Sequence, residues 1–245
     1  MTENLNPVRV SITGMDGSGK SSAYRAFVES VPADLTVVRI SRFCSVIENG
    51  EERIVGRRVS EALDNVHEWA DSTKSRGLIT AANTAWVLNS WRRQERKLTE
   101  RYKPDLVLGL RDPYIDPIAY ASYYNEGVLG ARSIEERTRL LHRIHGAPIS
   151  EGTIFLDVDP DIAVERINKR LAEEAASPRT MERAKWVHLH ENAADLTGIR
   201  AEYNTTLDHF AANHGVDVTV INTVDSSKED VAQLVRTKLL EPFGY

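Results

Sequence analysis

The sequence predicts an α/β fold in which a doubly wound, parallel sheet of five strands is flanked by helices. Short apolar runs rich in β-branched residues alternate with longer segments of helical period, which is typical of parallel strands joined by crossover helices. The runs are almost continuously apolar, as strands buried on both faces are. A glycine-rich turn follows the first run, at the edge of the sheet where ligands bind in such folds.

The strands are expected where β-branched and other apolar residues cluster, and segments of helical spacing separate them. The expected strands lie at 8–13, 35–40, 105–110, 153–158 and 216–221. The expected helices lie near 18–30, 52–70, 78–101, 116–125, 133–145, 160–174, 182–212 and 227–240. No linker, repeat or low-complexity tract interrupts the chain, so we expect a single domain over residues 1–245.

The composition narrows the class of protein. A hydrophobic content of 41% and a charged content of 27% are those of a soluble globular protein, and a net charge of −5 gives no support for a nucleic-acid partner. Cys44 is the single cysteine, which excludes an intrachain disulfide framework and fits a reduced setting. Residues 1–7 are polar, and no apolar run approaches the roughly 18 residues of a membrane span. We therefore expect a cytoplasmic enzyme that does not associate with membranes.

The glycine-rich turn matches the phosphate-loop pattern G-x-x-x-x-G-K-[ST] at every fixed position of residues 14–21. Its glycines let successive backbone N–H groups turn toward phosphate oxygens, and the following helix N-terminus adds partial positive charge. Lys20 would reach the β- and γ-phosphates, and Ser21 would offer its hydroxyl to Mg²⁺. A nucleoside triphosphate is therefore the expected ligand. The residues expected to hold it are Gly14, Asp16, Gly17, Ser18, Gly19, Lys20, Ser21 and Ser22.

Residues 169–183 differ from the rest of the chain because they are charged, have few large apolar side chains and contain the helix-breaking pair Ser177-Pro178. Two interpretations remain open. The segment is either a charged surface connection or a mobile lid whose arginines fold over a triphosphate. In the second case Arg170 and Arg179 close over the transferring group, with Arg183 as a further candidate.

A phosphate loop by itself does not separate a GTPase, an ATPase motor and a small-molecule kinase. The guanine-reading pattern Asn-Lys-x-Asp is missing, since the pair Asn168-Lys169 lies in an expected helix and lacks the aspartate. The missing pattern therefore excludes the GTPase class for this chain.

Beyond the phosphate loop, the chain resembles the thymidylate kinase family of nucleoside monophosphate kinases. Four blocks in the family's order carry the resemblance across nearly the whole chain. They are residues 13–22, 110–120, 155–170, and 220–223 with 226–235. The first has an acid where the family's phosphate loop has one, and the second is similar to an Asp-Arg-Tyr block followed by Ala-Tyr. The third is close to the strand that leads into the lid, and the fourth to the last strand and the adenine-facing loop.

On the donor side, the resemblance implies phosphoryl transfer from Mg-ATP by positioning and charge neutralisation. Asn222 falls at the adenine-facing loop. Asp16 matches an acid that contacts either the acceptor's sugar hydroxyl or the metal region. Asp112, at the end of an expected strand, is in position to hold Mg²⁺ directly or through water, although a turn residue before Pro113 is the other interpretation.

On the acceptor side, the resemblance points to Arg42 near the acceptor and to Arg92 as the ligand of an acceptor phosphate. The alternative for Arg92 is an exposed arginine in a basic helical run. Tyr114 and Tyr120 would line the base or sugar pocket, but aromatic residues after a strand are more often part of the core.

Three departures from the family fall on the acceptor side. Pro113 replaces the arginine of the Asp-Arg-Tyr block, and it is open whether Arg111, on the other side of Asp112, takes its place. Ala121 stands where a thymine-reading glutamine is usual, and residues 43–51 replace a glycine- and proline-rich segment. The base is therefore not specified by the sequence.

Three functions remain open. The first is a thymidylate-kinase-like enzyme that phosphorylates a nucleoside monophosphate. The second is a kinase for a modified nucleotide, a nucleoside or another small alcohol. The third is a catalytically silent ATP-binding protein, which the intact donor residues disfavour. Members of the family are often homodimers, and the sequence does not establish whether this chain is one.

Overall fold

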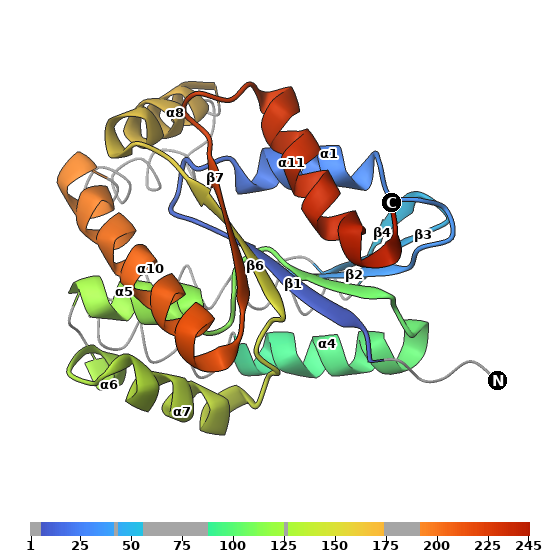
Figure 1. Ribbon diagram of the computed structural model, residues 1–245, viewed down its shortest axis with the longest axis horizontal. Coiled ribbons are helices and arrows are strands. Elements are labelled where there is room, and N and C mark those ends of the chain that lie inside the picture. The colour runs from blue at the N-terminus through green and yellow to red at the C-terminus, as the bar shows by residue number, and fades with distance from the viewer. Residues whose placement is uncertain (1–5, 42–43, 56–87, 125–126, 174–191) are drawn as a thin grey trace.

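The computed structural model describes residues 6–41, 44–55, 88–124, 127–173 and 192–245 (Figure 1). Seven described strands form one sheet in the order β4-β3-β2-β5-β1-β6-β7. Five of them are parallel: β1 (Val8–Thr13), β2 (Val37–Ile40), β5 (Leu106–Gly109), β6 (Gly152–Asp157) and β7 (Asp217–Asn222). They are the five strands expected from the sequence, and the α/β class is confirmed.

The sheet has two more strands than the sequence analysis predicted. β3 (Ser45–Glu48) pairs antiparallel with β2, and β4 (Glu51–Ile54) pairs antiparallel with β3. A two-residue turn joins them, in which Asn49 has a φ of 54° and Gly50 a φ of 75°. Asn-Gly is the preferred pair for such a hairpin turn, because both positions need positive φ. The expected helix from residue 52 is therefore wrong over residues 52–54, and its remainder lies outside the described residues.

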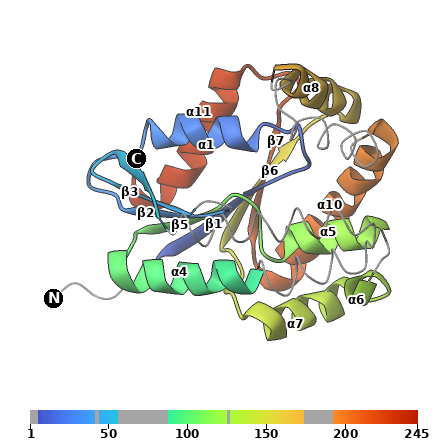
Figure 2. The same cartoon turned by 180° about the vertical axis from the view of Figure 1, so that it is seen from behind.

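Helices cover both faces of the sheet (Figures 1 and 2). On one face lie α1 (Lys20–Val28) and α11 (Lys228–Leu240), and on the other α4 (Leu88–Tyr102), α5 (Ile115–Tyr124) and α10 (Ala193–His214). Side chains alternate between the faces: Ile154 packs with α1 and α11, whereas the next residue, Phe155, packs with α5 and α10. This alternation explains why the strands read as continuous apolar runs.

Three further helices and a 3-10 turn complete the described chain. They are α6 (Gly127–Gly130), α7 (Ile134–His145), α8 (Pro160–Glu173) and η2 (Glu241–Phe243). A capping box on Ser133 begins α7, and Gly146 ends it. Only residues 169–173 of the predicted lid are described, as the last turns of α8. None of the described helices is long and apolar enough to cross a membrane.

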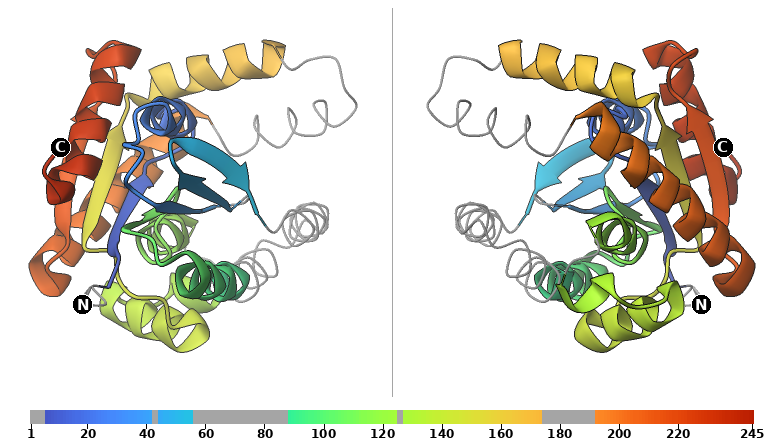
Figure 3. Two further views of the ribbon diagram at one scale, coloured as in Figure 1. Left: turned by 90° about the vertical axis from the view of Figure 1, so that its right-hand side faces the viewer. Right: turned by 90° about the vertical axis from the view of Figure 1, so that its left-hand side faces the viewer.

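The topology determines where a ligand can bind. β1 lies between β5 and β6, and the chain leaves β1 toward β2 on one side and returns to β6 on the other. Such a switch point opens a crevice at the carboxyl ends of the strands. The phosphate loop follows β1 at this edge, with α1 and α8 above it (Figure 3).

Candidate active site

The phosphate loop has a backbone that only glycine accommodates at two positions. Gly14 and Gly17 have φ values of +143° and +81°. A Cβ atom would lie 2.6 Å from the Leu156 carbonyl oxygen at position 14, and 2.6 Å from the Ala163 carbonyl oxygen at position 17. Both glycines are therefore required for the loop to pack against β6 and α8.

The N-terminus of α1 is open toward the loop. Gly19 occupies the N-cap position with a φ of 98°, no side chain caps the helix, and its first turn has no acid. A Cβ atom at Gly19 would meet nothing within 4 Å among the described residues. Ser21 and Ser22 are exposed in the first turn. The first N–H groups of a helix lack partners within the helix and attract anions, so the residues fit a triphosphate, and the Ser21 hydroxyl fits its Mg²⁺.

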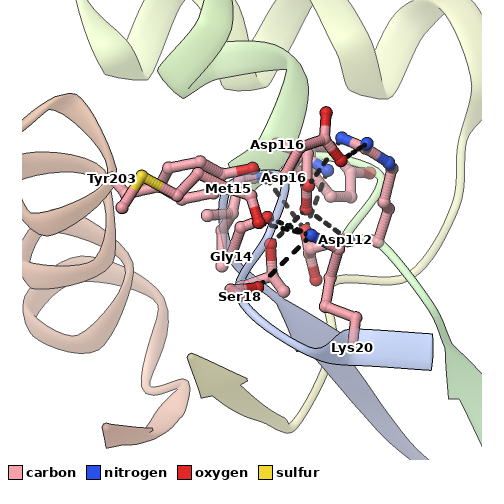
Figure 4. A network of polar contacts seen from close by, with 12 residues as sticks. Gly14, Met15, Asp16, Ser18, Lys20, Asp112, Asp116 and Tyr203 are labelled. Atoms are coloured by element: carbon pink, nitrogen blue, oxygen red, sulfur yellow. Dashed lines mark hydrogen bonds and ion pairs between the residues drawn. The ribbon is translucent and has the colours of Figure 1, made fainter. Parts of the chain in front are cut away.

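The ammonium group of Lys20 turns back into the loop. It donates hydrogen bonds to the carbonyl oxygens of Gly14 (2.5 Å) and Met15 (2.8 Å), and it lies 3.5 Å from Ser18 Oγ (Figure 4). Burial lowers the pKa of Lys20 to about 8, against the opposing effect of the Asp16 carboxylate. A phosphate group in the loop would offer this ammonium better acceptors than two neutral carbonyl groups.

Arg111 reaches across to the phosphate loop. Its Nη2 donates a hydrogen bond of 3.2 Å to Asp16 Oδ1, and its Nη1 lies 3.5 Å from Asp116 Oδ1. The guanidinium also lies over the Tyr120 ring, 5.8 Å from the centroid. Arg111, whose role the sequence left open, thus places a fixed positive charge beside the acid of the loop. The carboxylate of Asp16 is 29% exposed and remains accessible to a ligand.

The sequence analysis missed Asp116, which holds this arrangement together (Figure 4). Its carboxylate accepts hydrogen bonds from Thr13 Oγ1 (2.5 Å), the Asp112 backbone N–H (2.7 Å) and Tyr203 Oη (2.7 Å). Asp116 thereby ties the end of β1 to α5 and α10. Its position in the first turn of α5, four residues after Asp112, was the only signal in the sequence.

Asp112 is buried, and hydrogen bonds from the protein already occupy both oxygens of its carboxylate. Oδ2 accepts hydrogen bonds from the hydroxyls of Ser11 (3.0 Å) and Ser150 (2.8 Å). Oδ1 accepts from the backbone N–H groups of Tyr114 (2.8 Å) and Ile115 (2.9 Å). Four donors fill the approximately four acceptor sites of a carboxylate. This arrangement supports the turn interpretation, and Asp112 does not fit as a direct ligand of Mg²⁺.

The two tyrosines expected at the acceptor lie in different surroundings. Tyr114 is fully buried, donates its hydroxyl hydrogen to the Ala147 carbonyl oxygen and packs against His145, 4.9 Å between centroids. It belongs to the core and has no surface for a ligand in this conformation. Tyr120 is partly exposed and lies beside Arg111.

Arg92 lies on α4 beside a buried carboxylate. Its Nη1 donates to Glu95 Oε1 at 3.1 Å, and Arg9 Nε donates to the same oxygen at 3.4 Å. Together with Arg111 these three side chains line a pocket between α4 and the sheet. Arg42 and Arg179, which the sequence also nominates, lie outside the described residues.

On the donor side, α8 lies against the phosphate loop and links it to the loop after β7. Arg166 donates to Thr223 (2.7 Å to the carbonyl oxygen) and to the Gly17 carbonyl oxygen (3.4 Å), a link that the sequence analysis missed. Arg170 lies close enough for its charge to lower the pKa of Lys20, and its buried Nε has no hydrogen-bond partner among the described residues. Asn222 Oδ1 accepts from the Val224 N–H at 2.8 Å and shapes the turn after β7.

No protein-family model and no curated protein sequence matches the chain. Solved structures do share its fold. A deoxyadenosine kinase from M. mycoides, with the products dCMP and a flexible dCDP bound, matches with a TM-score of 0.58 and 12% identity, over 96% of this chain and 100% of that one. The same kinase with bound dATP matches with a TM-score of 0.56 and 14% identity, over 95% and 98%. The chain thus shares the fold of this deoxyadenosine kinase.

Proposed function

We propose that this protein is a P-loop kinase that transfers the γ-phosphoryl group of Mg-ATP to a hydroxyl group of a nucleoside. The observation that carries the proposal is the partly exposed carboxylate of Asp16 within the phosphate loop, 3.2 Å from Arg111 Nη2. A carboxylate among phosphates is electrostatically unfavourable unless it has a task there. Accepting the proton of an acceptor hydroxyl is such a task. The fold shared with deoxyadenosine kinase supports this reaction class.

The residues support a transfer in which the phosphate loop, Lys20 and α8 hold the phosphates of the donor ATP. The loop amides and Lys20 bind the β- and γ-phosphates, and Arg170 adds charge from α8. When bound with ATP, Mg²⁺ supplies charge neutralisation, and Ser21 is its candidate ligand. The acceptor oxygen forms a bond to the γ-phosphorus while the bond from that phosphorus to the β,γ-bridging oxygen breaks. Asp16 takes the hydroxyl proton, and ADP leaves.

The charges favour an acceptor without a phosphate. With Lys20 engaged by the donor phosphates, the acids Asp16 and Asp116 outnumber Arg111. The guanidinium of Arg92 is already paired with Glu95. An acceptor phosphate would have to compete with these carboxylates. A nucleoside, being uncharged, would not.

A nucleoside monophosphate, with dTMP as the first example, is the second candidate acceptor. The pocket lined by Arg9, Arg92 and Arg111 contains three guanidinium groups and the single carboxylate of Glu95. That excess of positive charge is the observation in its favour, since arginine binds phosphate in a bidentate manner.

The test is ADP release from Mg-ATP by the purified protein against a panel of deoxynucleosides, ribonucleosides and their 5′-monophosphates. Stimulation by one or more nucleosides supports the proposal. Stimulation by monophosphates alone favours the second candidate. ATP binding without stimulation by any member contradicts both and leaves the catalytically silent protein.

A further inference from the structure

Helix α7 passes near the carboxyl end of α10, away from the phosphate loop (Figures 1 and 2). Two histidines and a glutamate of these helices form a cluster. Glu135 lies in the first turn of α7, and His209 and His214 belong to α10. Glu135 Oε2 lies 3.6 Å from His209 Nε2 and 3.7 Å from His214 Nε2. One ligand atom from each of the three side chains lies within 4.8 Å of the other two.

The two imidazole nitrogens that face Glu135 lack hydrogen bonds. Both Nε2 atoms are buried, and neither has a hydrogen-bond partner among the described residues. Their distances to the carboxylate exceed the roughly 3.2 Å of an ordinary N–H···O hydrogen bond. Buried polar atoms almost always have a partner, so two such atoms aimed at one carboxylate indicate a missing group between them.

We propose that Glu135, His209 and His214 bind one divalent transition-metal ion, and that zinc is its best match. Two imidazole nitrogens and one carboxylate oxygen are a known zinc ligand set, in which water takes the fourth position. Ligand atoms about 2.0–2.1 Å from a tetrahedral zinc ion lie roughly 3.3 Å apart. The two spacings from Glu135 to the histidines, 3.6 and 3.7 Å, are slightly wider than this, and all three ligand atoms lie within 4.8 Å of one another, so side-chain rotations must bring them closer. Mg²⁺ and Ca²⁺ prefer oxygen ligands and are poor competitors here.

Neighbouring side chains hold the two imidazole rings. The Phe210 ring packs against His209 and His214, with centroids 6.0 Å and 4.9 Å away. Asn213 Nδ2 lies 3.3 Å from His209 Nδ1. A metal ion on Nε2 leaves the proton on Nδ1, which then needs an acceptor, either water or the amide oxygen of Asn213. A flip of the Asn213 amide would provide this acceptor, at the cost of the 2.9 Å hydrogen bond that Nδ2 donates to the His209 carbonyl oxygen.

The site lies at the opposite end of the sheet from the phosphate loop. His214 precedes β7, which runs parallel to β6 and β1, so it lies near the amino ends of these strands. The phosphate loop follows the carboxyl end of β1. The ion therefore takes no part in phosphoryl transfer, and its effect is to clamp α7 to α10.

The test uses the full chain, stripped of metal with a chelator and titrated with ZnCl₂ in the presence of excess Mg²⁺. Calorimetry measures stoichiometry and affinity, and the melting temperature measures stabilisation. The variants are Glu135→Gln and the double variant His209→Gln with His214→Gln. Asp208→Asn is the matched control, since it removes an exposed carboxylate next to His209 without touching the proposed ligands. Absorption of the Co²⁺-substituted protein reports the coordination geometry independently of activity.

The wild-type protein and Asp208→Asn should bind one zinc ion per chain. At a free zinc concentration about one hundred times the Kd, their melting temperature should rise by roughly 5–10 °C. Glu135→Gln should bind more than about tenfold more weakly, and the double variant should lose the site. Failure of the wild type to saturate at one ion per chain would overturn the proposal. Binding that remains unchanged in both variants would also overturn it.

Discussion

The guanidinium of Arg111 lies 3.2 Å from the carboxylate of Asp16, although the two residues are 95 positions apart in the chain. The contact joins the loop that follows β5 to the phosphate loop that follows β1. The Arg111 side chain is partly exposed, and the nearby carboxylates of Asp16 and Asp116 keep its pKa well above the usual range. A permanent positive charge is therefore held beside the acid that we propose as the catalytic base.

Replacing Asp16 by Asn tests the role of that acid. We expect kcat to fall by about 10²-fold or more, because the acceptor hydroxyl loses its base. ATP should bind at least as tightly as before, since the substitution removes a negative charge from among the phosphates. Steady-state kinetics and calorimetry measure the two effects separately. Asp208→Asn, on an exposed face of α10, serves as the control. An unchanged kcat in Asp16→Asn would exclude Asp16 as the base.

The pH dependence of ATP binding tests Lys20. Its pKa is lowered to about 8 in the ligand-free protein, chiefly by burial, and bound phosphates would raise it again. Binding should therefore take up a proton above about pH 8, and the Kd for Mg-ATP should rise by up to tenfold per pH unit there. Calorimetry in buffers of different ionisation enthalpy measures this uptake. Lys20→Arg, which stays charged, should bind ATP without that dependence, and a wild-type Kd that is flat from about pH 7 to about pH 9 would contradict the assignment.

Asp112→Ala separates a structural role from a metal role. The substitution leaves two backbone N–H groups and two hydroxyls without their acceptor. We expect a melting temperature about 5–10 °C lower, with the Mg²⁺ concentration for half-maximal activity unchanged. Asp112→Asn, which keeps one acceptor oxygen for the backbone, should be affected less. A large rise in the Mg²⁺ requirement at an unchanged melting temperature would restore Asp112 as a metal ligand.

His145 makes the fold sensitive to acid. Burial lowers its pKa to about 4, and its Nδ1 accepts a hydrogen bond from the Ala147 N–H at 3.0 Å. In the unfolded chain His145 takes up a proton near pH 6.5, whereas in the folded chain it does so only near pH 4. The stability that neutral His145 contributes to the fold is therefore present above about pH 6.5 and is lost as the pH falls toward 4. Urea unfolding should show a loss of about 2 kcal/mol from this group at pH 5. His145→Asn should flatten the dependence, and an equally steep loss in that variant would point to other groups.

The parts of the fold set by local pattern were predictable. The five parallel strands follow from continuous apolar runs, and the phosphate loop follows from the fixed positions of its pattern, of which packing requires glycine at Gly14. The hairpin of β3 and β4 was also readable from Asn49-Gly50, and the helical interpretation of the charged residues after it was mistaken.

The parts of the site set by tertiary contacts were not predictable. Tyr203 binds Asp116 across 87 positions, and nothing in either local sequence indicates the pair. Asp112 follows a strand as a metal-binding acid would, but Ser11 and Ser150 approach it from distant segments and satisfy its carboxylate. Tyr114 lies next to the site in sequence, yet its side chain points into the core.

The most direct test of the proposed reaction is transfer of label from γ-labelled Mg-ATP, with equal concentrations of 2′-deoxynucleosides and their 5′-monophosphates, followed by identification of the products. The proposal predicts a labelled nucleoside monophosphate, with kcat/KM for the nucleoside at least about tenfold above that for the matching monophosphate. Lys20→Ala should abolish the transfer. Label found only in nucleoside diphosphates, or only in inorganic phosphate, would contradict the proposal.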